Sequence, residues 1–464
     1  MTGRHLITLT GPRRHRSGHA ARTLLRAGIV LALLATRASA GHLKVDDDRA
    51  QCPTAAYTRI QAAVNAAAPG DTIVVCPGHY AEQVTITKAV KIKGKAPKVK
   101  TCNTLATPDP TIHTVIDAPP VTGVGGIGFD VFADNVAIQN LVIMNAGETG
   151  IRTDPAYGAF TLKNSVLYQD ANGIYFHSRP TTRSTVKSNC FYNSGEAGVR
   201  TRYGLVDASI TRNLFFNTVD AAAIIVDHEP ATTTERVTIS RNLSNQDSTF
   251  AVLVGTKDTL VSKNTVDTTV GTAIFVGGDN VGLTIAGNKV TNAGTRGIRF
   301  NTAAFGGGPS TGVLVSKNTV DKAGIHGISV DSSAGESTLV SSTIEKNTVS
   351  NSGQTGAGDG IRVEDPTASG ANGGNTIQNN AISGSFNHDC HDATVGTGTA
   401  GTANTWSHDS ASTQNVANLC FSGGANGVAE TTSTSTSTTS TTSSTIPSGS
   451  PSSAFVAPVQ DMLD

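Results

Sequence analysis

Two short patterns alternate along most of the chain, and this internal repeat constrains the fold more than any other feature. The first pattern is an aliphatic residue, two variable residues and an asparagine, and it ends at Asn189, Asn213, Asn242, Asn264, Asn288, Asn318, Asn347 and Asn380. The second is a small residue, an aliphatic residue, a variable residue and usually another aliphatic residue, and it starts at Gly150, Gly173, Gly198, Ala223, Ala251, Ala273, Gly297, Gly327 and Gly360. Successive starts of the second pattern lie 22 to 33 residues apart.

Each unit predicts short strands that stack into a coil. Apolar residues at every second position are typical of a strand with one buried face, and strands this short need neighbours above and below them. Connecting segments such as "GGDNVG" have no helical period, which argues against an α/β fold, and no six-residue period indicates a left-handed hexapeptide helix. We therefore predict an all-β fold, a right-handed parallel β-helix of about ten coils.

Asparagine has a structural reason to recur at one corner of the coil. It tolerates the left-handed backbone of a sharp turn, and its amide can hydrogen-bond to the same asparagine one coil away. At Asn140 and Asn164 the first pattern is one residue shorter.

The N-terminal part predicts a cap on the coil. Tyr57, Ile60, Val64 and Ala67 share one face of a helix-like stretch, which precedes a turn and two strand-like runs. A helix across the open end would protect the edge strands from pairing with another chain.

This region resembles a known family. Residues 57–94, above all "PGHYAE" at 77–82, resemble the first coil of the pectin-lyase-like superfamily, which includes pectin esterases and polysaccharide lyases. The segment "HDCHDATVGTGTAGTANTW" from His388 resembles the closing segment of bacterial members. The resemblance covers roughly residues 50–425 and implies a secreted β-helix that binds or acts on a polysaccharide.

The two ends of the chain differ from the repeats. Residues 1–40 contain seven arginines, no acidic residue, the apolar run "AGIVLALLA" and a final "ASA", as a signal peptide does; a disordered basic tail is the alternative. We expect a signal peptide at 1–40, an N-terminal cap and first coils at 41–135, repeats with the closing segment at 136–425, and a Ser/Thr-rich disordered tail at 426–464. The tail is either a solvated spacer or a glycosylated stalk. These features predict a secreted or cell-surface protein.

Charge and cysteine content narrow the function classes. Without residues 1–40 the chain has 35 − 7 = 28 basic and 35 acidic residues, a net charge of −7, which argues against nucleic acid as a partner. No segment after the signal peptide is expected to cross a membrane.

Six cysteines in an exported protein predict disulfides, and we expect Cys52–Cys76 and Cys390–Cys420, one at each end of the coil. The pairing of Cys102 and Cys190 stays open.

A ligand groove is expected on the strands of the second pattern. Their aliphatic residues point inward, so the variable residues point outward, and the resemblance implies that these strands line a substrate groove. The residues predicted to bind substrate are Arg152, Asp154, Arg202, Asp227, His228, Phe275 and Arg299. Those predicted to be catalytic are Tyr175, His177 and Arg200. Leu253 and Phe275 would add an apolar step that stacks against a sugar ring. Arginine's forked donors suit carboxylates, which favours an acidic, uronate-containing polysaccharide.

Several catalytic motifs of the superfamily are incomplete. Gln169 and Asp170 match the start of a pectin-esterase motif, but its second catalytic Asp has no counterpart. His326 resembles a polygalacturonase histidine without the upstream Asp pair, and "VDHEP" resembles a pectate-lyase strand without its trailing arginines. Asp331 and Glu364 are the carboxyls that could serve hydrolysis.

β-Elimination is the better chemical fit, with His177 or Tyr175 as base and Arg152, Arg200 and Arg202 neutralising a uronate. No cofactor is certain; if a metal binds, Ca²⁺ is expected, with Asp154, Asp227 and Glu229 as ligands. The competing hypothesis is a non-catalytic glycan-binding, adhesive or structural β-helix. Whether the protein is an enzyme, and its oligomeric state, stay open.

Overall fold

The computed structural model describes residues 40–95, 108–118, 125–180, 182–227, 232, 234–302, 307–332, 337–365, 371–422 and 424. Almost all of the expected signal peptide, the Ser/Thr-rich tail, Cys102, His228 and Glu229 lie outside these residues.

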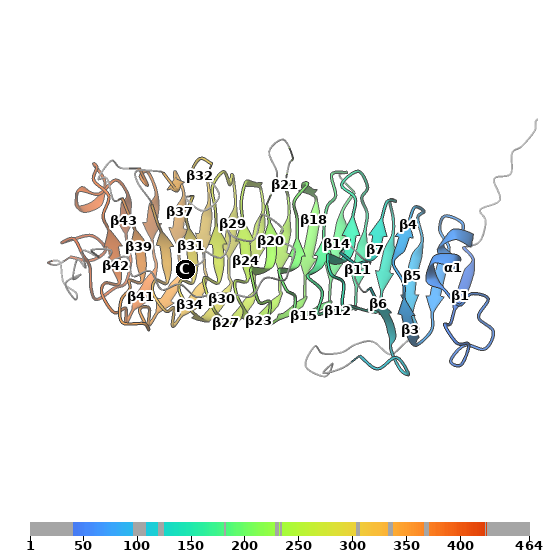
Figure 1. The fold of residues 1–464 in the computed structure, drawn as a ribbon. Coiled ribbons are helices and arrows are strands. Elements are labelled where there is room, and N and C mark those ends of the chain that lie inside the picture. The colour runs from blue at the N-terminus through green and yellow to red at the C-terminus, as the bar shows by residue number, and fades with distance from the viewer. Residues whose placement is uncertain are drawn as a thin grey trace, which may run out of the picture. The chain divides into compact units, whose positions relative to one another are not determined.

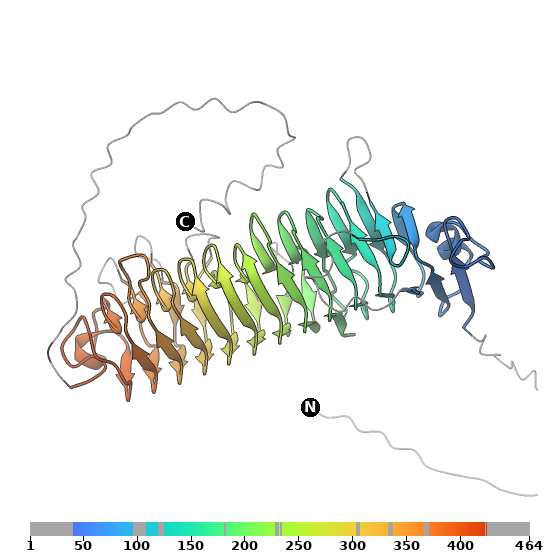
Figure 2. The ribbon, with the colours of Figure 1, turned by 90° about the horizontal axis from the view of Figure 1, so that it is seen from below.

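Three parallel sheets form the coil (Figures 1 and 2). In strand order, sheet 1 contains β1 (His42–Val45), β2 (Thr72–Val75), β5 (Lys91–Gly94), β8 (Ala137–Gln139), β11 (Thr161–Lys163), β14 (Ser184–Lys187), β18 (Ala208–Thr211), β22 (Thr238–Ser240), β26 (Leu260–Ser262), β29 (Thr284–Ala286), β33 (Leu314–Ser316), β37 (Thr343–Glu345), β40 (Thr376–Gln378) and β43 (Thr405–Ser407). Sheet 2 contains β3 (Gly78–Ala81), β6 (Thr114–Asp117), β9 (Val142–Met144), β12 (Val166–Tyr168), β15 (Cys190–Tyr192), β19 (Leu214–Phe216), β23 (Leu243–Asp247), β27 (Thr265–Thr269), β30 (Lys289–Ala293), β34 (Thr319–Asp321), β38 (Thr348–Ser350) and β41 (Ala381–Ser383). Sheet 3 contains β4 (Val84–Ile86), β7 (Ile127–Val131), β10 (Thr149–Thr153), β13 (Asn172–Tyr175), β16 (Ala197–Arg200), β20 (Ala222–Val226), β24 (Ala251–Leu253), β28 (Ile274–Val276), β31 (Ile298–Phe300), β35 (Ile328–Val330), β39 (Ile361–Val363) and β42 (Cys390–Asp392).

Each coil runs through sheet 1, then sheet 2, then sheet 3, and the next coil pairs with it in register. The sheets hold 12 to 14 strands, more than the coils counted from the repeats, because the first coils and the closing segment join the same sheets. Shorter pairings flank them: β17 (Leu205–Val206), β21 (Thr234–Glu235) and β25 (Thr256–Lys257) in one small sheet, and β32 (Ser310–Thr311) with β36 (Leu339–Val340) in another.

One continuous apolar core fills the coil, as the alternation predicted. Ile174 and Phe176 of the second pattern are completely buried in it. So are Val199 and Ile224, which align with Ile174 on the next two coils. Burial of a Leu-, Ile- or Phe-sized side chain stabilises the fold by about 1.5–3 kcal/mol, so the stacked core outweighs the weak preferences of these short strands.

The asparagine corner lies between sheets 1 and 2 and forms the predicted amide ladder. In Asn264, for example, Nδ2 donates to Oδ1 of Asn288 over 2.9 Å, and Oδ1 accepts from Nδ2 of Asn242 over 3.0 Å. The left-handed backbone belongs to the residue before the ladder position: Lys263 has φ +57°. Asn140 and Asn164 are themselves left-handed, which explains why their pattern is one residue shorter.

Both ends of the coil are closed. Helix α1 (Ile60–Ala66) buries Ile60, Ala63 and Val64 against the core. The disulfides Cys52–Cys76 and Cys390–Cys420 are present, as expected, and Cys190 is also disulfide-bonded. A single turn of 3-10 helix, η2 (Thr399–Gly401), precedes β43. Among the described residues, no helix has the length and apolar character needed to span a membrane.

Candidate functional site

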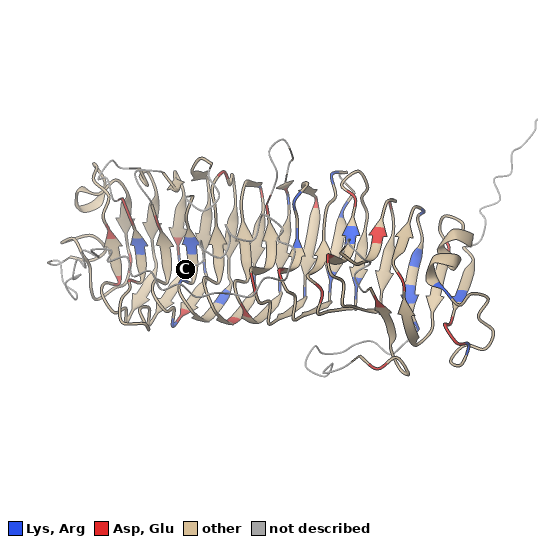
Figure 3. Ribbon diagram, viewed as in Figure 1, with Lys and Arg blue, Asp and Glu red and all other residues tan. Residues whose placement is uncertain are grey.

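The outer face of sheet 3 carries two polar clusters that are separated by apolar strands. The middle strands β20, β24 and β28 contain no charged residue, whereas β7, β10 and β16 on one side and β31 and β39 on the other do (Figure 3). The N-terminal cluster contains most residues predicted from the sequence. The second cluster surrounds Asp359 and includes Arg299, Arg362, His388 and His391. We call it the Asp359 cluster.

Arg152, Tyr175 and Arg200 are neighbours in successive strands, as predicted. Their charges, however, are compensated inside the protein. Arg152 contacts Asp130 over 2.7 Å and Glu148 over 3.3 Å, and Arg200 contacts Glu196 over 2.8 Å. These carboxylates were not foreseen as partners, and a substrate carboxylate would have to compete with them.

His177 occupies the outward position but is only 3% exposed, although it was expected to face a groove. Its Nδ1–H donates to the carbonyl of Thr153 over 2.9 Å, which leaves Nε2 as an acceptor. Nε2 is buried without a hydrogen-bond partner, and the ring centroids of His177 and Tyr203 lie 5.2 Å apart. Burial lowers the pKa of His177 to about 4. The imidazole is therefore a neutral group that a substrate could reach only after Tyr203 moved.

Tyr175 is half-buried, its hydroxyl accepts a hydrogen bond from Asn172 over 3.2 Å, and burial raises its pKa. Because the pKa is raised, less of the phenolate that would act as the base is present at neutral pH.

The remaining predicted residues of this end do not converge on one point. The Arg202 guanidinium lies 5.7 Å from the ring of Tyr203. Asp154 accepts from the backbone N–H of Ala156 over 2.8 Å in a local turn. Among the described residues, Asp154 and Asp227 do not join any group of three potential metal ligands, and Glu229 lies outside the described residues.

The apolar step on sheet 3 is not open to a sugar ring. Phe275 is 1% exposed, and the Arg299 guanidinium lies 5.6 Å from its ring centroid. The prediction for Leu253 was wrong: Leu253 is in the core and Val252 takes the outward place, aligned between Ile225 and Phe275. These side chains bury one another because they are large and the rungs are only about 4.8 Å apart.

The Asp359 cluster is built from two columns of residues on successive coils. Arg299, Ser329, Arg362 and His391 are aligned in β31, β35, β39 and β42. Arg296, His326, Asp359 and His388 form the second column, just before these strands, and are linked coil to coil by backbone hydrogen bonds. In the earlier coils the first column also holds ionisable residues such as Arg152 and Arg200, but the second column holds Thr149, Asn172, Ala197 and Ala222. The fold itself therefore does not require ionisable groups in the second column.

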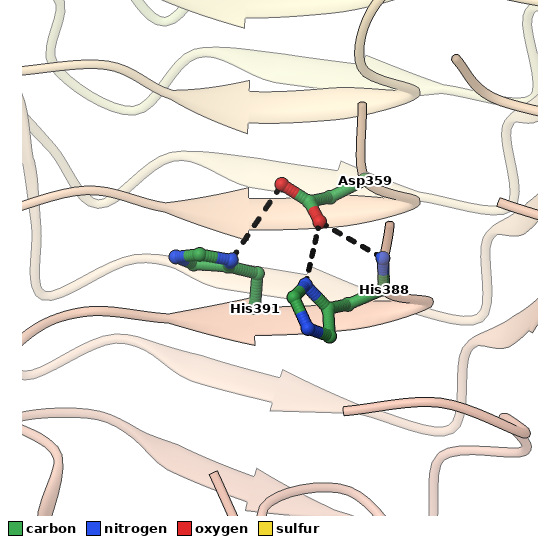
Figure 4. Close-up of side chains that lie close together, drawn as sticks. All are labelled: Asp359, His388 and His391. Atoms are coloured by element: carbon green, nitrogen blue, oxygen red, sulfur yellow. Dashed lines mark hydrogen bonds and ion pairs between the residues drawn. The ribbon is translucent and has the colours of Figure 1, made fainter. Parts of the chain in front are cut away.

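Asp359 lies at the centre of this cluster and its side chain is completely buried (Figure 4). Oδ1 accepts from the backbone N–H of His388 over 3.0 Å and lies 3.1 Å from Nδ1 of its ring. Oδ2 accepts from Arg362 over 2.7 Å and lies 3.6 Å from Nδ1 of His391. Burial alone would raise the pKa of Asp359, but these partners hold it well below its ordinary value. Asp359 is therefore a permanent anion that orients its neighbours.

The rest of the cluster is paired around this centre. Arg299 donates to Asp331 over 2.7 Å, and Arg362 donates to Glu364 over 2.7 Å. Nδ1 of His326 accepts from the backbone N–H of Asp359 over 3.0 Å, and burial lowers the pKa of His326 to about 4. Among the carboxyl groups named here, Glu364 is the most exposed, at 30%.

The ligand atoms of Asp359, His388 and His391 lie within 4.8 Å of one another, so a metal ion has to be considered. Arg362 argues against it. A guanidinium nitrogen lies 2.7 Å from Oδ2 of Asp359 and 3.5 Å from Nδ1 of His391, where a cation would have to sit. Because Arg362 already supplies the positive charge there, the donor set fits a hydrogen-bonded centre better than a metal centre.

Sequence reasoning missed Asp359, His388 and His391, although it did include Arg299. The register Ile361–Cys390 and Arg362–His391 shows why. "DCHD" occupies the place of "GIRV", but it lacks the glycine and aliphatic residues that identify the repeat. The signal was the pair of histidines three residues apart in "HDCH", directly after the last recognisable repeat.

Solved structures with similar folds include the catalytic domain of a GH87 α-1,3-glucanase in complex with tetrasaccharides, at 14% identity over 67% of this chain and 60% of that chain, with a TM-score of 0.52. The A-module of the mannuronan C-5 epimerase AlgE6 from Azotobacter vinelandii matches at 14% identity over 69% of this chain and 93% of that chain, with a TM-score of 0.49. A mannuronic acid specific polysaccharide family 6 lyase from human gut microbiota matches at 14% identity over 70% and 76% of the chains, with a TM-score of 0.42. At such identities the likeness concerns the fold alone.

No curated protein sequence matches this chain significantly. The family described as "Right handed beta helix region" matches residues 111–239 and 230–344, which together span just over half of the chain. Its match runs from β6 into β37 and includes the asparagine ladder from Asn189 to Asn318. The chain therefore belongs to the right-handed β-helix family, with the pectin-lyase-like fold that its first coil resembles.

Proposed function

We propose that this is a secreted protein that binds a uronate-containing polysaccharide across the outer face of sheet 3 and cleaves it by β-elimination at the Asp359 cluster. The observation that carries the proposal is the buried Asp359 carboxylate, which holds His388, His391 and Arg362 in place. Such a centre costs desolvation energy and is not needed by the fold. The disulfides and the signal-like segment 1–40 support an exported protein.

The length of the coils that carry the Asp359 cluster supports a ligand site at this cluster. Gly297, Gly327 and Gly360 are 30 and 33 residues apart, the longest spacings in the repeat. In repeat proteins such insertions gather as loops on one face, often the binding face. A glucanase domain that binds tetrasaccharides has a similar fold, so a polysaccharide is a reasonable ligand class for this face.

His388 is the base in this proposal. Its Nδ1–H points to the Asp359 carboxylate, so the neutral ring presents Nε2 as the acceptor, as in other Asp–His pairs. Nε2 has no hydrogen-bond partner among the described residues, and the side chain keeps 11% exposure. Asp359 acts through His388 and is a positioning residue.

The chemical step removes the proton at C5 and breaks the C4–O4 bond. Nε2 of His388 removes the proton at C5 of the uronate, the electron pair forms the C4–C5 double bond, and the C4–O4 bond breaks. The leaving oxygen takes a proton from water, and the hydroxide so formed takes the C5 proton back from Nε2. Arg299 and Arg362 would neutralise the charge that develops on the uronate carboxylate, which has to compete with Asp331 and Glu364 for their donors. Hydrolysis fits less well because it needs two carboxyl groups beside the bond, whereas Asp331 is only 7% exposed and Asp359 is fully buried.

The test separates binding from cleavage. Purified protein is incubated with pectate, alginate, glycosaminoglycans and a neutral glucan, with and without Ca²⁺, and both affinity and the ultraviolet absorbance of unsaturated product are measured. We expect binding and product with at least one uronate polymer. Binding without product would support the non-catalytic alternative, a glycan-binding β-helix. Binding to the neutral glucan alone, or no binding at all, would overturn the proposal.

Variants then test the assigned roles. We expect His388→Ala to lower kcat by about 10²–10⁴-fold with little change in KM, and added imidazole to restore part of the rate. His79 is the matched control, because its ring also lies 3.1 Å from a carboxylate, that of Asp117, but on sheet 2. His79→Ala should leave kcat unchanged. An equal loss in both variants, or a His388→Ala enzyme of normal rate, would contradict the role of His388.

A further inference from the structure

A second polar surface lies on the outer face of sheet 1, away from the strands that carry the Asp359 cluster. A cavity of about 450 Å³ opens there over β5, β8 and β11. Its lining includes Lys91, Lys93, Lys95, Gln139, Asn140 and Lys163. We call this surface the lysine cradle.

The fold fixes the lysines on one side. In β5 Ile92 points into the core, so Lys91 and Lys93 point outward and are exposed. The register aligns Lys93 with Gln139, and Gln139 with Lys163, on successive coils. Ammonium groups from neighbouring coils therefore share one concave surface.

The floor of the cradle is rigid. Asn140 has φ +60°, and its Nδ2 donates to the carbonyl of Gly94 over 2.9 Å. A Cβ atom on Gly94 would lie 2.0 Å from the carbonyl oxygen of Asn140, so only glycine permits this close approach.

Among the described residues, no carboxylate pairs with the lysines of the cradle at positions 91, 93 and 163. None of the residues that line the cavity is acidic. Lys91, Lys93 and Lys163 form no ion pair with a carboxylate of the described residues, whereas Arg152, Arg200, Arg299 and Arg362 on sheet 3 all do. Lys93 and Lys163 lie two rungs apart with the neutral Gln139 between them, so an anion bound over Gln139 would be close to both ammonium groups.

We infer that the lysine cradle binds an anionic glycan segment whose sulfate or carboxylate groups contact Lys91, Lys93 and Lys163. Lysine is a point charge that suits either anion, and the cavity has the size range of small-ligand sites. Nucleic acid fits less well, because no aromatic side chain lines the cavity to stack with a base. This site does not depend on the cleavage proposed for sheet 3, since it shares no residue with it.

The experiment measures affinity of the full chain for three probes of matched charge: a sulfated oligosaccharide, an oligouronate and single-stranded DNA. We expect a glycan to bind more tightly than DNA, with affinity that falls as salt rises. Lys93→Ala with Lys163→Ala should weaken glycan binding by about tenfold or more and reduce its salt dependence. The His388→Ala protein should bind at this site as the unsubstituted protein does.

Lys289 provides the control, because it is an exposed lysine on β30 of sheet 2. Lys289→Ala should bind like the unsubstituted protein, and the Lys93→Glu protein should lose binding while it keeps its melting temperature. Tighter binding of DNA, no binding of either glycan, or the same loss in Lys289→Ala would overturn the inference. If the His388→Ala protein lost uronate cleavage but kept glycan binding at the lysine cradle, this would support a cradle that is independent of the site on sheet 3.

Discussion

Replacing one rung of the asparagine ladder should destabilise the coil by an amount that can be worked out from its hydrogen bonds. The side chain of Asn264 is 1% exposed and takes part in four of them. In Asn264→Leu the backbone N–H of Asn242 loses its acceptor, whereas Nδ2 of Asn242 keeps the carbonyl of Ile210 at 2.9 Å. Oδ1 of Asn288 likewise keeps the backbone N–H of Asn264 at 3.0 Å.

One buried donor is thus orphaned, which costs about 1–3 kcal/mol, and three further bonds are lost, two of whose partners keep another hydrogen bond. We expect the free energy of unfolding to fall by about 2–4 kcal/mol in total. Urea denaturation followed by circular dichroism measures this loss. The only tryptophan, Trp406, is buried in β43, so its fluorescence reports separately on the last coil.

Asn245→Ala is the matched control, because Asn245 lies in β23 one coil earlier and its amide reaches Asp267 only at 3.5 Å. It should cost less than about 0.5 kcal/mol. An Asn264→Leu protein as stable as the unsubstituted one, or a control that loses as much, would show that the ladder does not stabilise the corner.

Three further predictions concern stability. Burial raises the pKa of Asp247 to about 6, above its unfolded value. The contribution of this carboxyl to the free energy of unfolding is therefore fully present at low pH and is lost as pH rises through 6. The melting temperature should be higher at pH 5 than at pH 8, and Asp247→Asn should flatten this dependence. Gly173→Ala should cost about 1–3 kcal/mol, because its Cβ would lie 2.6 Å from the Phe191 ring, whereas Gly195→Ala, with no atom closer than 3.5 Å, should be nearly neutral in thermal melts. Asp409→Leu should lower the melting temperature, because the backbone N–H of Asn380 donates to Oδ1 of Asp409 over 2.8 Å and would lose this buried acceptor.

The repeat predicted the fold because each unit contains its own periodic signal. Alternation placed Ile174 and Phe176 in the core, and the recurring asparagine placed the corner between two sheets. Glycine or alanine at the start of the second pattern also has a structural reason. Gly173 and Gly198 face the Phe191 and Phe215 rings, which leave no room for a Cβ atom.

The site was harder to predict than the fold. The alternation of apolar and variable residues shows which way a side chain points, but not which residue it contacts. It identified Arg152 and Arg200 as outward, yet it could not assign their carboxylate partners Glu148 and Glu196, which lie four residues earlier in "GETGIR" and "GEAGVR" and precede the strands. It also could not indicate that His177 would be covered by Tyr203, since that contact joins different coils. Ion pairs between coils, and the burial of one side chain by another, depend on the size of the side chains and on the path of the loops. A pattern within one coil does not contain this information.

The ladder itself explains why an aspartate ends it. Each asparagine donates through Nδ2 to Oδ1 of the next coil, so every member needs an acceptor on its C-terminal side. Asn380 finds that acceptor in Oδ1 of Asp409, which also accepts the backbone N–H of Asn380 over 2.8 Å. The terminal position has to accept but has no later coil to which it could donate. A carboxylate meets this requirement because it only accepts, and it places negative charge where aligned amide N–H groups point. The direction of the side-chain ladder is thus the direction in which the coils are stacked.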